Sequence, residues 1–169
     1  VIDPVFIGLH ATAPDSSGEM SSKMIPKAYP EEKLGVFCKA NKKLDVIEYS
    51  DLPVELSKER GEDGRLKFLA GSIAIHVIGV SFIEKLNHDP AFSLPYHRAE
   101  KKIACIDPAT GNAIAPSSNN GVKLERFVFD ALAFASKPIV YETDRLEEFA
   151  PIKNATGVDS VESCAQLQT

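Results

Sequence analysis

The sequence has no run of lysine or arginine, although 19 Lys and Arg residues stand against 24 Asp and Glu, giving a net charge of −5. Without a basic stripe, nucleic acid and an anionic membrane are poor candidates for a partner. No apolar run approaches the roughly 20 residues that a membrane-spanning helix needs, and no signal peptide is visible. These absences argue against nucleic-acid and membrane functions. They leave phosphate binding open, because a few local lysines suffice for it.

Cysteine is also scarce. Cys38, Cys105 and Cys164 lie far apart, and no C-x-x-C pair indicates a zinc or redox site. The simplest interpretation is three reduced thiols, which predicts a reducing, intracellular compartment, the cytoplasm. We expect no role for these cysteines in chemistry.

The common catalytic signatures are missing as well. The sequence contains no P-loop, no G-x-G-x-x-G, no H-E-x-x-H and no G-x-S-x-G. Its four histidines, His10, His76, His88 and His97, lack the spacing of metal ligands. His76 lies in an apolar run, which favours a core or pocket-edge residue. We predict no metal ligand within this chain.

What is present is an ordinary globular composition, with 44% apolar and 25% charged residues in 169 positions, enough for one domain with a core. The first residues, Val1-Ile2 and 5–7, form an apolar, strand-like run, and the last, 159–167, resemble a helix. Natural domains tend to end in polar linkers. We therefore expect the chain to be part of a longer polypeptide.

Apolar patterning and turn residues predict a succession of strands. The expected strands cover residues 20–27, 34–38, 44–49, 68–78, 102–106 and 139–142. The turn at 41–43 makes 34–38 and 44–49 a hairpin, and the long apolar run 68–78 suits a strand buried on both faces.

Helices are expected between these strands. A short one follows a cap at Ser50-Asp51, another opens with the capping-box spacing of 81–84, and turns of helix cover 145–149. Residues 122–135 repeat apolar side chains at i, i+3, i+4 and i+7, which predicts the longest helix. Alternating strands and helices with one hairpin indicate an α/β fold built on a mixed sheet.

Four segments, in this order and spacing, resemble the UDP-N-acetylglucosamine pyrophosphorylase family, within the wider UDP-sugar pyrophosphorylases. They are VIDPVFIG (1–8), VIEYS (46–50), NGVKLERFVFD (120–130) and EFAPIKN (148–154). The resemblance covers nearly the whole chain. It implies part of a Rossmann-like nucleotide-diphospho-sugar transferase sheet with flanking helices, from the C-terminal part of the catalytic domain. Residues 1–154 would be its sugar-binding half, and 155–169 the start of a following helical segment.

The resemblance also implies a reaction, in which UTP and N-acetylglucosamine 1-phosphate give UDP-N-acetylglucosamine and pyrophosphate. A sugar-phosphate oxygen attacks the α-phosphorus of UTP in line, and catalysis relies on positioning and positive charge. Mg²⁺ normally supplies part of that charge. Its main aspartate ligand, the Gly-rich nucleotide loop and the uridine-reading residues are expected before Val1. The partners are then UTP, a hexose 1-phosphate and the rest of the polypeptide, without which this chain is incomplete for activity.

Several residues match the family's site. Glu48 and Tyr49 match its sugar-binding pair, since a carboxylate accepts hydrogen bonds from two hydroxyls at once. Gly35 matches a glycine where the backbone approaches the sugar. Lys153 matches the lysine of a Phe-x-Pro-x-Lys motif and is predicted to be catalytic, as a point charge on the phosphates. Without the resemblance, a solvated strand end and an exposed loop lysine would be the simpler interpretations.

Other matches concern the sugar's identity. Ser72 stands where the family most often has asparagine, which puts the N-acetyl sugar in doubt but not the reaction class. Lys123 is expected at a helix N-terminus, where free N–H groups favour phosphate. Phe127, on the same helical face, and Phe129 match aromatic positions suited to an N-acetyl pocket, although core packing is the commoner fate of such residues.

Three alternatives stay open at this stage. The first is a glucose-1-phosphate uridylyltransferase or a broad UDP-sugar pyrophosphorylase, which Ser72 favours. The second belongs to another class, a non-catalytic sugar-nucleotide-binding domain. The third is a purely structural α/β domain.

Overall fold

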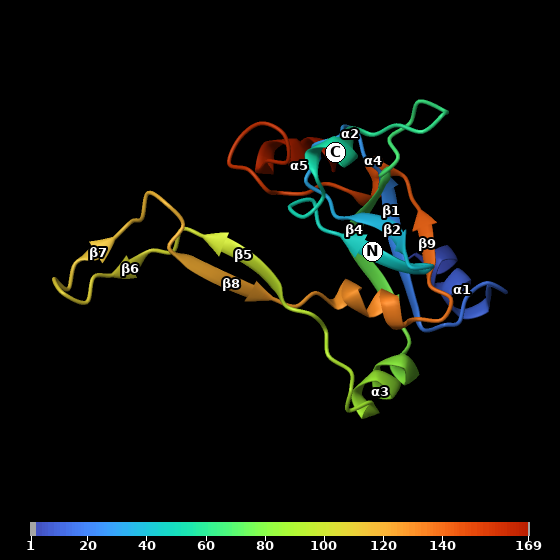
Figure 1. Ribbon diagram of the computed structural model, residues 1–169. Helices are drawn as coiled ribbons and strands as arrows, with labels where there is room; N and C mark the ends of the chain where they lie inside the picture. The colour runs from blue at the N-terminus through green and yellow to red at the C-terminus, as the bar shows by residue number, and fades with distance from the viewer. Residues whose placement is uncertain (1–2, 169) are drawn as a thin grey trace.

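The computed structural model describes residues 3–168, which form a five-stranded mixed sheet with helices around it and a long β arm (Figure 1). The strands are β1 (Met20–Pro26), β2 (Val36–Ala40), β3 (Lys43–Ile47), β4 (Ala70–Ile78), β5 (His97–Lys101), β6 (Cys105–Ile106), β7 (Ala113–Ile114), β8 (Gly121–Glu125) and β9 (Ile139–Glu142). The helices are α1 (Pro4–Thr12), α2 (Val54–Lys58), α3 (Val80–His88), the 3-10 helix η1 (Val128–Phe134), α4 (Arg145–Glu148) and α5 (Val161–Leu167).

The main sheet has the strand order β3-β2-β4-β1-β9. All neighbours are antiparallel except β1 and β9, which run parallel. The mixed α/β sheet predicted from the sequence is therefore confirmed. The predicted hairpin is β2–β3, whose turn residues Asn41 and Lys42 take φ values of 50° and 67°. Such left-handed pairs match the twist of a two-residue hairpin.

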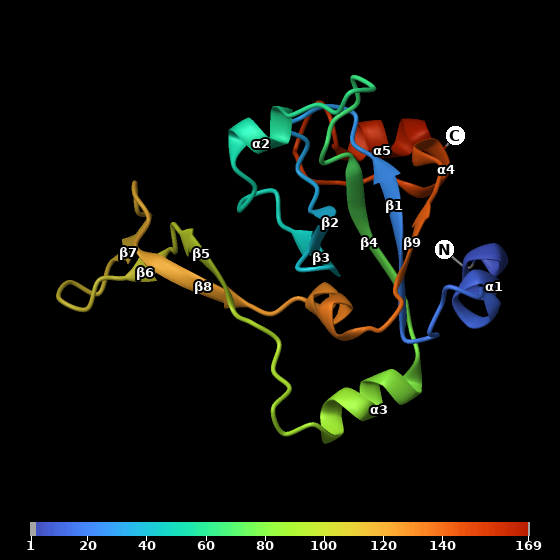
Figure 2. The same cartoon turned by 45° about the vertical axis from the view of Figure 1, so that its right-hand side comes forward.

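One face of the sheet carries the hydrophobic core. Met20 and Met24 of β1 pack there with Phe37 of β2, and Phe129 and Leu132 of η1 complete the cluster. Figure 2 shows η1, in orange, between the sheet and the arm. The core therefore fixes the segment that follows the arm against the sheet.

Helix α1 covers β1 and β9 from another side, and it corrects the strand expected at 5–7. The Asp3 carboxylate accepts hydrogen bonds from the amides of Val5 and Phe6, and Pro4 occupies the first helical position. This is a favourable helix start, so the apolar run is helical. Phe6 stacks on Tyr141 of β9 with 5.7 Å between ring centroids. Val1 and Ile2, the rest of the predicted run, lie outside the described residues.

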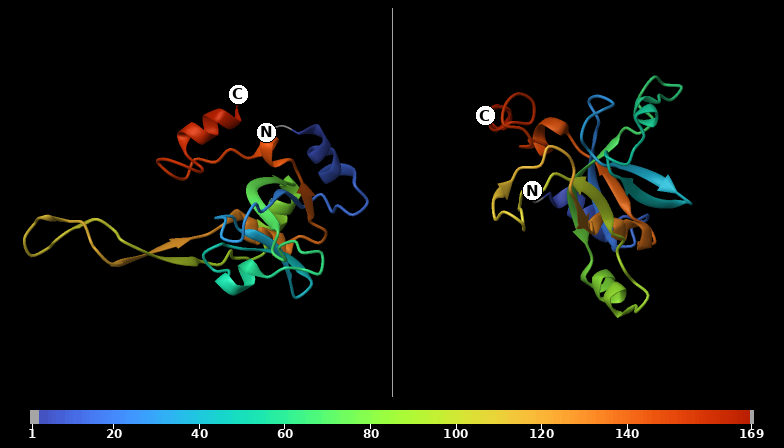
Figure 3. Two further views of the ribbon diagram at one scale, coloured as in Figure 1. Left: turned by 90° about the horizontal axis from the view of Figure 1, so that it is seen from above. Right: turned by 60° about the vertical axis from the view of Figure 1, so that its left-hand side comes forward.

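The arm consists of β5 paired with β8 and β6 paired with β7. It projects away from the sheet in Figures 1 and 2 and in the left view of Figure 3. The helix predicted at 122–135 is wrong, because its first part is β8 and its second part is η1. Val122 to Glu125 alternate apolar and charged side chains, which is a strand period, and β5 supplies the backbone partner. The strand expected at 102–106 is reduced to β6.

Other expected elements are present with different details. Strands β1, β4 and β9 and helices α2 to α5 are confirmed, but both predicted caps are wrong. Helix α2 begins after Pro53 and α3 after Gly79, and neither has a side-chain cap. Most of β4 is half-buried rather than buried on both faces. Among residues 3–168, no helix has the length and apolar character that crossing a membrane requires.

Candidate functional site

A small cavity of about 220 Å³ opens between β2, β3, β4 and the loop after α4. Its lining residues are Lys33, Leu34, Gly35, Glu48, Tyr49, Ser72, Ile73, Ala74, Phe149 and Lys153. Five residues predicted from the sequence, Gly35, Glu48, Tyr49, Ser72 and Lys153, therefore lie in one cavity although the chain separates the first from the last by most of its length. Their roles toward a substrate stay predictions.

Glu48 and Gly35 depend on each other. Glu48 lies just after β3, and a Cβ atom placed on Gly35 would be 2.9 Å from its Oε1 and 3.0 Å from Cγ1 of Val46. A side chain at position 35 would displace the carboxylate from this position, which is a physical reason for a glycine here. Burial raises the pKa of Glu48, with a further contribution from Asp51, whereas His97 and Lys153 act in the opposite direction.

An irregularity of β4 forms the opposite wall. The register runs from Met24↔Ser72 to Ser22↔His76, so β4 has more residues than β1 between these pairs. Ala74 takes a φ of 58°, a left-handed conformation that an alanine rarely adopts. Such bulges occur next to functional sites, where they redirect side chains. The amide of Ser72 donates to the carbonyl of Gly35 at 2.8 Å, which ties this wall to β2.

Lys153 lies at the rim of the cavity. Its Nζ donates to the carbonyl oxygen of Lys33 at 2.6 Å and lies 5.7 Å from the ring centroid of Phe149. Its backbone amide donates to the carbonyl of Asp159 at 2.6 Å, which fixes the loop behind it. The ammonium is thus a positive charge held at an open cavity by a neutral oxygen, an arrangement that can serve an anionic ligand.

The predicted aromatic residues adjoin this site through a dyad that the sequence analysis missed. Phe127 and Phe129 stack with centroids 4.8 Å apart, and His97 lies 4.7 Å from Phe127. Nε2 of His97 is 2.8 Å from Oδ2 of Asp130, and both residues act on the pKa of Glu48. In the sequence, His97 was a lone histidine without the spacing of metal ligands. Asp130 was the last residue of the segment 120–130 that resembles the family.

Lys123 is a predicted residue that, like Phe127 and Phe129, does not line the cavity. It lies on β8 in the arm, so the helix N-terminus that motivated a phosphate site there is absent. Phe127 likewise does not share a helical face with it. The Nζ of Lys123 pairs with Oε1 of Glu125 at 2.7 Å, and its side chain is 57% exposed. The cavity-lining residues do not include it.

A magnesium centre does not fit the residues seen here. Residues 3–168 contain no group of three or more His, Cys, Asp or Glu side chains that could hold a metal ion.

No family model matches the sequence. The chain is, however, 38% identical over 157 residues to UDP-N-acetylhexosamine pyrophosphorylase-like protein 1 of Xenopus tropicalis, covering 93% of this chain and 30% of that protein. It is 37% identical over 161 residues to the UDP-N-acetylglucosamine pyrophosphorylase of Saccharomyces cerevisiae, with 93% and 33% covered. The chain thus spans about a third of the length of the curated relatives it matches.

The fold leads to the same relatives. A crystal structure of the uridine diphosphate N-acetylglucosamine pyrophosphorylase from Trypanosoma brucei, in complex with an inhibitor, superimposes with a TM-score of 0.73 at 28% identity. The match covers 98% of this chain and 31% of that one. The resemblance predicted from four sequence segments is confirmed: the chain is a relative of the UDP-N-acetylglucosamine pyrophosphorylases over about a third of their length.

Proposed function

We propose that the polypeptide containing this chain is a uridylyltransferase that makes UDP-N-acetylglucosamine and pyrophosphate from UTP and N-acetylglucosamine 1-phosphate. The observation that carries the proposal is the cavity in which Gly35, Glu48, Tyr49 and Ser72 face Lys153. A carboxylate beside a cation matches a ligand with hydroxyl groups at one end and a phosphate at the other. The names of the relatives support the same reaction.

In this proposal, Glu48 accepts hydrogen bonds from sugar hydroxyls, and Gly35 lets the backbone approach the ring. The half-buried ring of Phe127 supplies an apolar surface for the N-acetyl group, and Phe129, which packs in the core, supports it by stacking. Lys153 exchanges the carbonyl of Lys33 for phosphate oxygens and so draws negative charge toward itself as the transition state forms. The sugar-phosphate oxygen then forms a bond to the α-phosphorus of UTP, while the bond from that phosphorus to pyrophosphate breaks.

The remaining requirements belong to other parts of the polypeptide. We propose that UTP is held mainly by residues outside this chain, together with Mg²⁺, which would supply positive charge at its phosphates. We also propose a reducing, cytoplasmic location. In support of it, Cys38, Cys105 and Cys164 are free thiols, and Cys105 is exposed.

A second sugar is favoured by one observation. The side chain of Ser72 is shorter than that of asparagine. Its hydroxyl oxygen already accepts a hydrogen bond from the amide of Ala74 at 3.4 Å. A site with this shorter residue makes fewer contacts to an N-acetyl sugar. The runner-up is therefore a glucose-type or broad UDP-sugar pyrophosphorylase.

Turnover by the full-length protein tests the proposal. Pyrophosphate release is measured with UTP and either N-acetylglucosamine 1-phosphate or glucose 1-phosphate, and the expected result is a higher kcat/KM for the N-acetyl sugar. A preference for glucose 1-phosphate supports the runner-up. Binding of UDP-sugars without any turnover would identify the non-catalytic binding domain instead.

A further inference from the structure

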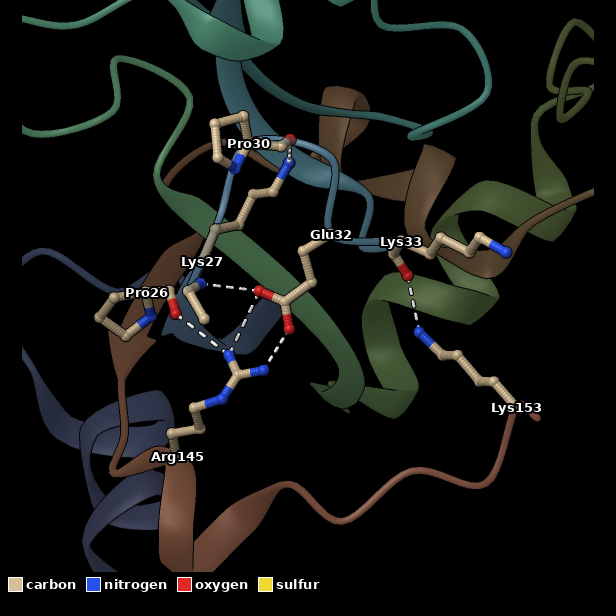
Figure 4. A network of polar contacts seen from close by, with 8 residues as sticks. Pro26, Lys27, Pro30, Glu32, Lys33, Arg145 and Lys153 are labelled. Atoms are coloured by element: carbon tan, nitrogen blue, oxygen red, sulfur yellow. Dashed lines mark hydrogen bonds and ion pairs between the residues drawn. The ribbon is translucent and has the colours of Figure 1, made fainter. Parts of the chain in front are cut away.

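Two segments on opposite sides of the cavity are joined by an ion pair between Arg145 and Glu32 (Figure 4). Arg145 is the first residue of α4, and Glu32 lies in the loop between β1 and β2. Nη2 of Arg145 donates to Oε1 of Glu32, while Nη1 lies 3.4 Å from Oε2 and 3.3 Å from the carbonyl of Pro26. The guanidinium therefore grips both the carboxylate and the end of β1.

Glu32 also organises its own loop. Its Oε2 accepts the amide of Ala28 at 2.8 Å, so one carboxylate ties the start of the loop to its end. The residue is only 3% exposed. A buried carboxylate needs its partners, because an uncompensated charge away from water is costly. The loop is thus held in one shape by Arg145.

The residues after Glu32 form one wall of the cavity. Lys33 offers the carbonyl to which Lys153 donates at 2.6 Å, and Gly35 lies against the Glu48 carboxylate. The segment after Arg145 forms the facing rim, where Phe149 precedes Lys153. The ion pair consequently joins the two segments whose ends meet at the Lys153 ammonium (Figure 4).

A shared aromatic ring provides a second link. The guanidinium carbon of Arg145 lies 5.4 Å from the ring centroid of Phe149, and Nζ of Lys153 lies 5.7 Å from the same centroid. Two cations on one ring form favourable contacts with its negative faces. A displacement of Arg145 therefore changes the position of Phe149 and, through it, that of Lys153.

We propose that Arg145 and Glu32 are positioning residues for the uridylyltransferase reaction, which set where the Lys153 ammonium meets the sugar phosphate. Neither residue lines the cavity, so both act through the loop carbonyl of Lys33 and the ring of Phe149. The inference rests on the proposed function for its catalytic consequence. The geometric part, control of Lys153 by the ion pair, stands apart from any reaction.

The catalytic consequence is tested by a double-mutant cycle in the full-length protein. Arg145→Lys keeps the charge but loses the two-pronged contact. It is expected to lower kcat about 10-fold in the otherwise wild-type protein. In the Lys153→Met background the further loss should be less than about twofold, because the ammonium that Arg145 positions is already absent. Equal losses in both backgrounds would show a general structural role and overturn the proposal.

Two controls accompany the cycle. Arg98→Lys changes an exposed arginine of the arm, 3.0 Å from Glu100, and is expected to leave kcat unchanged. Glu32→Gln keeps the size of the side chain and the contact to Ala28, so it provides a second variant if Arg145→Lys does not fold. It is expected to show the same dependence on Lys153, and additivity in this variant would equally contradict the proposal.

A readout without turnover separates this inference from the proposed function. Acetylation of each lysine by acetic anhydride is followed by mass spectrometry in the unliganded full-length protein. Arg145→Lys is expected to raise labelling of Lys153 relative to the arm residue Lys101, while Arg98→Lys leaves the ratio as it was. An unchanged ratio sinks the positioning role even in an active enzyme. If the wild-type protein shows no turnover, the proposed function is wrong, but the labelling ratio still tests whether Arg145 positions Lys153.

Discussion

The sheet contains a buried ion pair, whereas the ion pairs of the arm are exposed. In the sheet, Lys23 of β1 is fully buried and pairs with Asp3 at 2.9 Å and Glu148 at 2.6 Å, which connects α1 to α4. In the arm, Lys123 pairs with Glu125 at 2.7 Å with more than half of its side chain in water. The nitrogen–oxygen distances in these ion pairs are similar, whereas the burial of the lysine differs. The position of a lysine in the fold therefore determines its role, whether or not the lysine belongs to a family motif, as Lys123 does.

The largest expected difference between the two regions concerns stability. Lys23→Met is expected to destabilise the protein clearly, because it leaves the Asp3 and Glu148 carboxylates, each about one-fifth exposed, facing each other without a cation. Lys123→Met is the matched control, and its exposed pair should contribute almost nothing. Urea denaturation measures both. Similar losses in the two variants would show that burial of the ion pair is not what matters.

Substitution of a lysine at the cavity should lower activity more than substitution of a lysine in the arm. Lys153→Ala in the full-length protein is expected to lower kcat at least about 10-fold, since it removes a cation facing the phosphates. Lys123→Ala should change kcat less than about threefold, because its ammonium is already paired away from the cavity. Steady-state kinetics with both substrates at saturation provide the comparison. If Lys123→Ala is as damaging as Lys153→Ala, the arm contributes to the site after all.

The pH dependence of stability provides a smaller effect at the cavity. Burial raises the pKa of Glu48 above its ordinary value of 4.5, so the folded protein binds the proton more tightly than the unfolded chain. The associated stability is fully present below that ordinary value and is lost as the pH rises through the folded-state pKa.

Glu48→Gln should therefore equal the wild type in unfolding free energy near pH 4 and exceed it at pH 7, while sugar binding is lost. Glu100→Gln, on the exposed arm, is the matched control for the loss of one carboxylate charge. Denaturation curves at several pH values decide the point, and a variant that gains no stability at neutral pH contradicts the argument.

The smallest expected effect compares two alanines. Ala74→Gly relieves the left-handed backbone of the bulge and should stabilise the protein slightly, by less than about 1 kcal/mol. Ala99→Gly, in β5 of the arm, should destabilise it by about 0.5–1 kcal/mol, since glycine weakens a regular strand. Thermal unfolding of both variants shows whether the sign differs. A loss at both positions would mean that Ala74 is not strained.

The sequence predicted much of the sheet because its signals are local. The Asn41-Lys42 turn, the alternation around it and the apolar run of β4 each determine their structure over a few residues. The segment 122–135 failed because its helical spacing competes with pairing to β5, a distant partner that no local pattern reveals. The caps at Ser50 and Ser81 failed because a capping residue type, or the four-residue spacing 81–84, occurs in many segments that do not adopt the capping geometry.

The site was predicted in part, and for a different reason. Glu48, Gly35 and Lys153 came from resemblance, and their shared cavity gives each a physical role that the residues alone did not reveal. His97 and Asp130 were missed because they meet across 33 positions of sequence. Arg145 and Glu32 were missed because a buried ion pair leaves no spacing signature in the chain.

The parallel pairing of β1 with β9 has a consequence for how the protein is made. β1 is translated before both of its partners, and the partner on one side, β9, follows only after the whole arm has been translated. At ribosomal speeds this delay is on the order of ten seconds. During that time β1 presents an unpaired strand edge, the kind of surface on which nascent chains associate with one another or with chaperones.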